Sequence, residues 1–194
     1  MGHPAGRKEE GRARVLAAAG RGFRAQGYGG IGVDGLARAA GVTSGAFYAH
    51  FASKAAAFRA AVVAGMQDLR AGLAALRATG EGWRARFIGL YLDDRRTCDL
   101  AESCALQSLT GEVARADPET RAAYEAELQA VIAELAAGLE GGAEDGTDPG
   151  RRARATALLA LLAGGVSMAR AVRDPALAEE IAAAVRAAAL RLEG

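Results

Sequence analysis

Residues 33–54 restrict the possible folds of this chain more than any other segment. Apolar residues recur at helical spacing over residues 33–40, and Gly41 follows where glycine commonly ends a helix in the left-handed conformation. Thr43 or Ser44 then supplies a side-chain oxygen for the free N–H groups at the start of another helix. The segment therefore predicts two short helices joined by a tight turn.

The second of these helices has two faces of different chemistry. Phe47 and Phe51 are four residues apart and lie on one side of a helix, whereas Tyr48, His50 and Lys54 point elsewhere. These outward residues are hydrogen-bond donors suited to phosphates and base edges. Helix, turn and capped helix form the helix-turn-helix pattern, whose second helix enters the major groove of DNA.

A family resemblance rests on the run from Leu36 to Lys54, which reads LARAAGVTSGAFYAHFASK. This run resembles the N-terminal domain of the tetracycline-repressor (TetR) family of transcriptional regulators, and the likeness covers about residues 10–60. The resemblance implies an all-α fold of nine helices. It places a three-helix DNA-binding head in residues 1–53 and a six-helix ligand-binding and dimerisation body in residues 54–194.

The resemblance also implies which residues touch DNA. The first residues of the reading helix approach bases or phosphates, and the later ones contact phosphate or sugar, with Tyr48 able to reach a base. We expect DNA contacts from Arg38, Thr43, Ser44, Gly45, Ala46, Tyr48, His50 and Lys54. Family members usually carry two threonines before the first motif helix, but residues 30–33 here have no hydroxyl. We therefore expect a weaker cap and one phosphate contact fewer, with DNA shape and backbone contacts supplying much of the affinity.

Charge is divided unevenly along the chain. Residues 1–54 carry eight Lys/Arg and three Asp/Glu, a net +5, whereas residues 55–194 carry sixteen and twenty, a net −4. Neutralisation of phosphates supplies much of the affinity for nucleic acid, so the basic N-terminal part favours DNA binding. A short basic segment also arises by chance, and alone this split decides nothing.

Helical patterns continue through the rest of the chain. Three of the four prolines follow aspartate, and an Asp cap with Pro at the first helical position is typical of a helix start. A polar loop is expected at residues 141–147. Beyond the two motif helices, we expect helices at about residues 8–26, 53–76, 83–91, 99–115, 118–140, 149–173 and 175–192.

The last two predicted helices are candidates for self-association. Apolar residues cluster over 158–166, and a stripe runs through Leu177, Ile181, Val185 and Leu192. Both stripes equally suit packing against the protein's own core. The resemblance favours a homodimer through residues 149–192, because the family typically dimerises through its last two helices. A two-fold dimer would read a palindromic DNA site.

Composition excludes several other classes of protein. Aromatic residues make up 5% of the chain and β-branched residues are sparse, which argues against sheets. No apolar run reaches eighteen residues and the N-terminus lacks a secretory h-region, so we expect no membrane span and a cytoplasmic protein. Residues 27–32 match the dinucleotide-binding pattern G-x-G-x-x-G. This pattern binds a dinucleotide only where it follows a strand, and here it follows a predicted helix, so we expect no dinucleotide site. With only His3 and His50 available, we expect no metal, no cofactor and no enzymatic activity.

Cys98 and Cys104 leave an alternative open. Six residues place them on different faces of a straight helix, and Arg95 and Arg96 lie close enough in sequence to activate a thiolate. A redox- or electrophile-sensing, or otherwise small-molecule-binding, helical protein is the alternative function. Buried cysteine acting as a small apolar residue is the ordinary interpretation.

The resemblance implies a pocket in the body whose ligand releases the protein from DNA. Aromatic and pliable side chains on the body helices are the candidates for its lining, although such residues are more often plain core. They are Trp83, Phe87, Tyr91, Cys104, Leu106, Tyr124, Leu128 and Met168. The sequence thus predicts a DNA-binding transcriptional regulator, a repressor released from a palindromic operator by a small, mainly apolar or aromatic effector.

Overall fold

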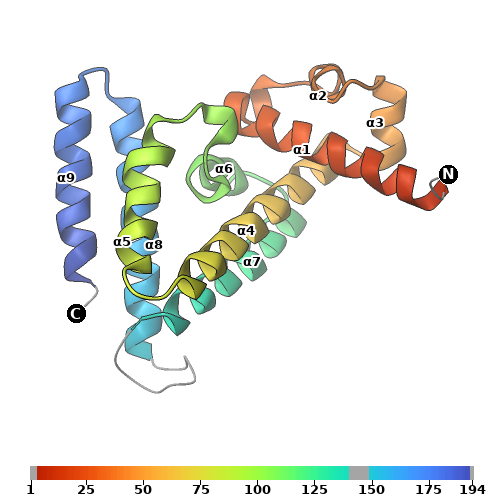
Figure 1. Ribbon diagram of the computed structural model, residues 1–194. Helices are drawn as coiled ribbons and strands as arrows, with labels where there is room; N and C mark the ends of the chain where they lie inside the picture. The colour runs from red at the N-terminus through yellow and green to blue at the C-terminus, as the bar shows by residue number, and fades with distance from the viewer. Residues whose placement is uncertain (1–3, 140–148, 193–194) are drawn as a thin grey trace.

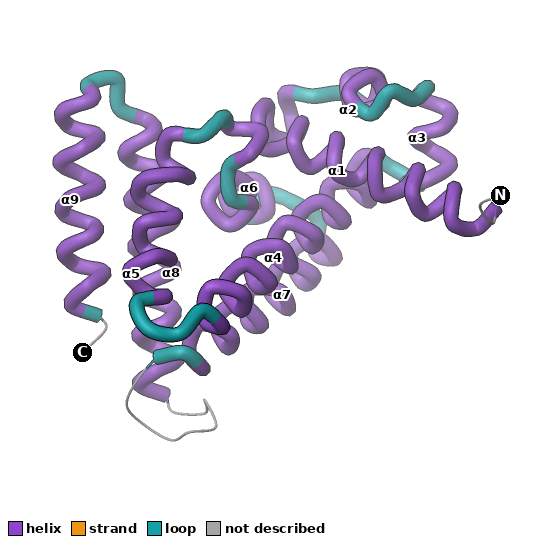
Figure 2. The backbone as a smooth tube through the Cα atoms, viewed as in Figure 1, coloured by secondary structure: helices purple, strands orange, loops and turns teal. Residues whose placement is uncertain are grey.

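The computed structural model describes residues 4–139 and 149–192, and all regular elements within these ranges are helical (Figures 1 and 2). The expected all-α fold of nine α-helices is confirmed there. The expected loop at residues 141–147 lies outside the described residues. In chain order the elements are α1 (Pro4–Gly30), α2 (Val33–Ala39), α3 (Ser44–His50), α4 (Lys54–Ala78), α5 (Trp83–Gly89), the π-helix η1 (Leu90–Arg95), the 3-10 helix η2 (Leu100–Glu102), α6 (Ala105–Val113), α7 (Pro118–Ala137), α8 (Pro149–Ala171) and α9 (Pro175–Arg191).

Most helix ends fall within a few residues of the predicted positions. Asp117 and Asp174 cap α7 and α9 as the Asp-Pro pairs predict, each accepting a hydrogen bond from a backbone N–H of the first turn. The predicted break after residue 26 appears as a kink at Gly27, whose φ is 72°. The segment near 99–115 divides into η2 and α6.

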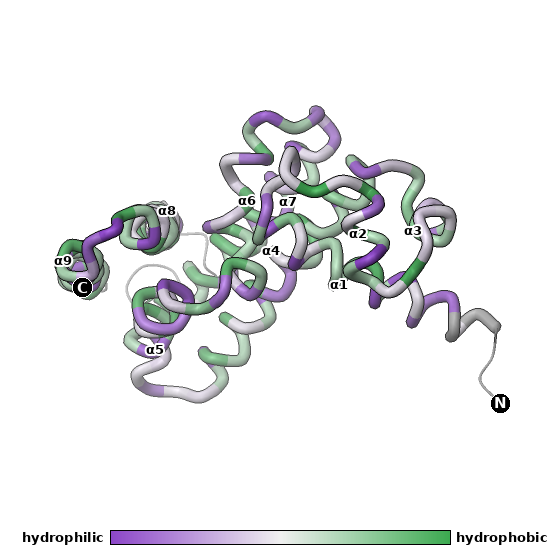
Figure 3. Tube along the Cα trace, turned by 90° about the horizontal axis from the view of Figure 1, so that it is seen from above, coloured by the Kyte–Doolittle hydropathy of each residue, from purple (hydrophilic) through white to green (hydrophobic). Residues whose placement is uncertain are grey.

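Helices α1–α3 form one end of the molecule, here called the head, and α4–α9 form the body. Figure 1 shows α2 and α3 above α1 at the end opposite α9, and the view from above in Figure 3 separates them in the same way. The head core extends past residue 53, because α4 and α6 supply buried residues to it. Its large members include Val15, Phe23, Leu36, Phe47, Phe51, Phe58, Val62, Leu109 and Val113.

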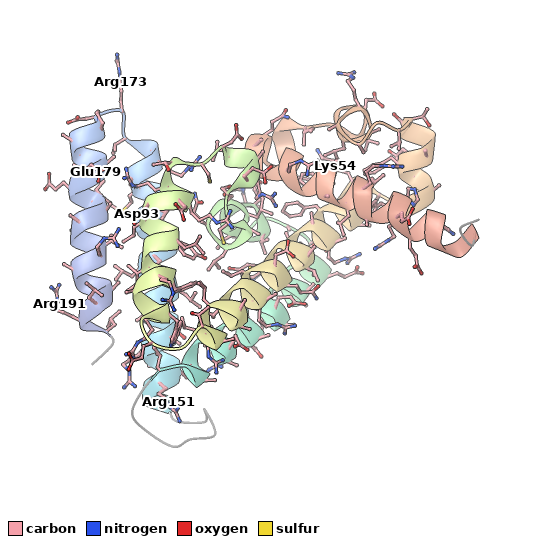
Figure 4. The ribbon with its side chains drawn as sticks, in the orientation of Figure 1. Lys54, Asp93, Arg151, Arg173, Glu179 and Arg191 are labelled. Carbon is pink, nitrogen blue, oxygen red and sulfur yellow. The ribbon has the colours of Figure 1, made fainter. Side chains whose placement is uncertain are left out.

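The body core lies between α4, α5, α7 and α8. Its buried members include Met66, Leu73, Phe87, Tyr91, Leu92, Val131, Leu135, Leu158, Leu162 and Val166. Helix α9 packs along α8 at the edge of the body (Figure 1). Two ion pairs of 2.6 Å, Arg96–Glu179 and Arg186–Asp93, join it to the π-helix and the residue after it; Figure 4 labels Glu179 and Asp93 on these facing elements. Within the described ranges, no helix combines the length and hydropathy needed to cross a membrane.

The α7 cap gives a pH-dependent stability. Because the Thr120 backbone N–H and hydroxyl donate to the Asp117 carboxylate, the pKa of Asp117 lies below its ordinary value. Its stabilisation is present above the unfolded pKa, near pH 4, and is lost as pH falls through the lower folded pKa. We expect the stability difference between wild type and Asp117→Asn to shrink below about pH 4.

Urea unfolding at pH 7, 4 and 3 measures this difference. Asparagine is the matched substitution because it keeps the cap oxygen but carries no titrating group. A wild-type advantage that stays constant down to pH 3 would contradict the assignment.

Candidate nucleic-acid interface

The turn between α2 and α3 has the geometry predicted for a helix-turn-helix. Gly41 has φ 68°, and the Val42 N–H donates to the Ala37 carbonyl at 3.0 Å, which closes the end of α2. Thr43 then caps α3, its hydroxyl accepting from the Ala46 N–H at 3.1 Å. The predicted weak start of α2 is also present, since its N-cap Gly32 makes no side-chain hydrogen bond.

Helix α3 is held from one side and open on the other. Phe47 is 0% exposed and packs against Phe51, with ring centroids 5.8 Å apart. The next residue, Tyr48, is 53% exposed, and its hydroxyl has no hydrogen-bond partner among the described residues. Gly45 is also exposed, and Ala46 is half-buried. The buried ring fixes α3 in place, so its outer face is exposed on a helix that is anchored by its other side.

Lys54 is positioned by an aromatic cluster beneath the start of α4. Its Nζ lies 4.5 Å from the centroid of the Tyr28 ring, a cation–π contact, and Figure 4 shows it at the head end of α4. Tyr28 in turn packs edge-on against Phe58, with centroids 5.1 Å apart. The ammonium group is therefore held close to the end of α3, and within the described residues it makes no ion pair.

The remaining predicted contacts have different surroundings. Arg38 is exposed on α2 and has no ion pair within the described residues. His50 is half-buried: its imidazole lies beside Gly11 of α1, and its Nδ1 has no hydrogen-bond partner. Ser44 donates to Asp34 of α2 at 2.5 Å. These side chains all lie on or beside α2 and α3.

Two head residues were missed by sequence reasoning. Arg12 lies over the Phe51 ring, 5.0 Å from its centroid, and is thereby placed beside the end of α3. The excess of basic residues in the N-terminal part is the only signal that pointed to it. Asp34 gave no signal, because the hydrogen bond to Ser44 joins residues ten positions apart on different helices.

The predicted pocket residues fall around two cavities on either side of α6. One, of about 530 Å³, lies between α6, α7 and α8 and is lined by Leu106, Tyr124 and Leu128 together with Thr110 and Ser167. The other, of about 210 Å³, is lined by Phe87, Tyr91 and Cys104 together with charged residues including Arg24 of α1 and Asp68. Trp83 and Met168 line neither cavity, and Met168 is 60% exposed on α8.

The cysteines are separate thiols. Cys104 is buried with its Sγ 3.1 Å from the Tyr91 hydroxyl, and burial raises the pKa of Tyr91. Cys98 is half-buried, with its Sγ 3.9 Å from Nη1 of Arg170. The burial of Cys104 favours a packing role, and the sensing alternative stays a prediction.

Helix α6 touches both the head and the larger cavity. Leu109 and Val113 belong to the head core, while Leu106 belongs to the body core and lines the cavity. Helix α4 approaches α6 so closely at Gly65 that a methyl group there would lie 2.5 Å from the Ala105 Cβ. Because α6 packs closely against α4 and supplies residues to the head core, a displacement of α6 would also move buried residues of the head.

The outer faces of α8 and α9 keep large apolar side chains exposed. Val185 of the predicted stripe packs against Gly165 of α8, so this part of the stripe faces the protein's own core. Leu177 at the start of α9 is 41% exposed, and Met168 lies near the same end of α8. One part of the predicted stripe on α9 therefore packs inside the body, and another part stays exposed to solvent.

Comparison with known proteins agrees with this geometry. The family model for bacterial regulatory proteins of the tetR family matches residues 15–61, which span most of α1, all of α2 and α3, and the start of α4. No curated protein matches the chain.

Solved structures extend the likeness over almost the whole chain. The reduced form of Escherichia coli NemR superposes with a TM-score of 0.71 at 25% identity, over 91% of this chain and 95% of that one. A TetR-family regulator from Agrobacterium tumefaciens gives 0.77 at 18% identity, over 96% and 100%. SCO4454, a TetR-family regulator from Streptomyces coelicolor, gives 0.69 at 24% identity, over 96% and 97%.

Proposed function

Because the chain belongs to the TetR family of transcriptional regulators, we propose that it binds a palindromic operator as a homodimer and represses transcription until a small effector releases it. The outer face of α3 is proposed to read the major groove. Arg38, Thr43, Gly45, Tyr48, His50 and Lys54 are proposed to contact DNA, with Ser44 and Ala46 at the start of the reading helix.

One observation carries this proposal. Adjacent residues of α3 have opposite surroundings, Phe47 at 0% exposure and Tyr48 at 53%, so an exposed donor projects from a helix fixed by its own core. Lys54 lies beside this helix over the Tyr28 ring. A fixed reading helix flanked by an available cation is what phosphate positioning and base contact require.

Binding of the purified protein to its own upstream DNA and to a fragmented genomic library tests the proposal. Gel retardation should yield at least one fragment that survives competition by excess unrelated DNA, and the shift should weaken with salt. If no fragment is retained specifically, the DNA-binding function is wrong.

Lys54 should contribute to this salt dependence. A phosphate contact adds roughly one unit to the slope of log K against log salt, and a dimer has two copies of Lys54. Lys54→Gln is therefore expected to reduce the slope by about two units, measured by fluorescence anisotropy over a salt series.

Arg59 provides the matched control one helical turn or so further along α4. Its guanidinium already pairs with Glu119 of α7, so Arg59→Gln should leave the slope unchanged. Equal slopes for wild type and Lys54→Gln would show that Lys54 does not touch phosphate.

The larger cavity is proposed as the effector site. Its lining is mainly apolar with hydroxyl and amide groups from Gln107, Thr110, Tyr124 and Ser167, and it includes no Asp, Glu, Lys or Arg side chain. Such a lining suits a neutral, apolar or aromatic molecule with one or two polar groups. Since α6 also packs into the head core, a ligand that displaces α6 would change the position of the head.

A variant that fills the cavity tests this site. Gly111 lines it at an exposed position of α6, and a Cβ added there meets no atom within 4 Å, so Gly111→Trp can place a ring at the cavity wall without a clash at its Cβ. Neutral aromatic compounds that raise the Tm of wild type and release DNA should do neither with Gly111→Trp. Equal responses would place the effector elsewhere.

A further inference from the structure

Asp34 and Ser44 form a hydrogen-bonded pair that joins α2 to the start of α3. The Ser44 hydroxyl donates to Oδ1 of Asp34 at 2.5 Å. Asp34 is exposed, and its carboxylate makes no ion pair within the described residues. It is also the only acidic residue between residues 11 and 54, a stretch otherwise marked by basic side chains.

The pair is not needed to start α3. Thr43 already caps that helix through its hydrogen bond from the Ala46 N–H. Asp34 lies in the first turn of α2, where a negative charge stabilises the positive end of that helix. It also lies next to the residues proposed to face DNA, where phosphate would repel it. In a complex with DNA, the pair would therefore contact a base edge rather than a phosphate.

Hydrogen-bond counting defines that partner. An ionised carboxylate only accepts, and the single hydroxyl proton of Ser44 is committed to Asp34. The two side chains therefore present hydrogen-bond acceptors to solvent and no hydrogen-bond donor. Among major-groove edges, guanine presents the acceptors N7 and O6, and thymine presents O4, so both are disfavoured.

Cytosine and adenine remain because each presents an amino donor. Adenine carries its N7 acceptor beside N6, and that lone pair would face the carboxylate, whereas cytosine has a C–H group beside N4. We infer that the Asp34–Ser44 pair makes each head select a cytosine at one position of its half-site, an inference that rests on the proposed entry of α3 into the major groove.

Selection from a random duplex library with wild-type protein, followed by affinities for the four bases at the selected position, tests this. Wild type should enrich a palindrome with one cytosine column per half-site and prefer cytosine roughly tenfold over guanine there. Asp34→Asn should move the preference toward adenine, because an amide pairs with N6 and N7. Ser44→Ala should weaken the cytosine preference without moving it to adenine.

Glu81→Gln is the matched control, since it removes one exposed negative charge in the α4–α5 loop far along the chain from the head. It should leave every base preference unchanged, and the Tm of each variant confirms folding. A wild-type palindrome whose base preferences are the same in Asp34→Asn and Ser44→Ala overturns the inference but leaves DNA binding intact. Enrichment of no sequence by wild type would instead remove the proposed function itself.

Discussion

Replacing Phe47 with alanine is expected to lower the free energy of unfolding of the head by about 3–5 kcal/mol and to abolish specific DNA binding. Phe47 is 0% exposed and is one of the largest fully buried side chains of the protein. Its removal leaves a cavity beneath α3 and next to the Phe51 ring. Thermal unfolding by circular dichroism and fluorescence anisotropy with the operator measure the two effects.

Tyr48→Ala is the matched comparison on the same helix. The ring is 53% exposed, so its loss should leave the Tm within the range of ordinary surface substitutions. DNA affinity should nevertheless fall by about 1 kcal/mol per head, the typical contribution of one hydrogen bond. If Phe47→Ala binds DNA as wild type does, or Tyr48→Ala unfolds like Phe47→Ala, the division between buried and reading faces is wrong.

The head could be predicted closely because its signals are local. The glycine turn at Gly41, the Thr43 cap and the four-residue spacing of Phe47 and Phe51 act within a few residues of one another. Local rules of capping and periodicity therefore suffice for the order and the boundaries of α2 and α3. The Asp-Pro helix starts at α7 and α9 were predicted for the same reason.

The site features that escaped prediction depend on contacts between distant positions. The Ser44–Asp34 bond and the stacking of Lys54 on Tyr28 bring together residues from different helices. Periodicity also predicted a single stripe on α9, but Val185 faces α8 while Leu177 stays exposed. A repeat along one helix fixes which residues share a face, and only packing decides what each part of that face meets.

The same limit applied to the pocket. Aromatic and pliable residues of the body were gathered into one candidate lining, yet α6 separates Tyr91 and Cys104 from Leu106 and Tyr124. Composition cannot assign side chains to one side of a helix that crosses the core. The position of α6 is decisive because it borders both cavities and also contributes to the head core.

A second large effect on DNA binding is expected from substitutions at exposed apolar residues of α8 and α9. Met168 and Leu177 lie at the same end of these antiparallel helices and are 60% and 41% exposed. We expect Met168→Glu/Leu177→Glu to convert the proposed dimer into a folded monomer, because a two-fold contact through this face would bring like charges together. Operator affinity should fall by about 10²–10⁴, the gain that linking two binding modules provides.

Leu190→Glu is the control, because the same substitution falls on another side of α9. Leu190 is 46% exposed, but at 100° per residue it lies about 140° around the helix from Leu177. It should leave both mass and operator affinity unchanged in sedimentation and anisotropy measurements. A double variant that remains dimeric, or a monomeric Leu190→Glu, would move the interface away from this face. If the monomeric double variant still bound the operator tightly, one head alone would supply the affinity that we attribute to two. Dimerisation would then not be needed for tight DNA binding.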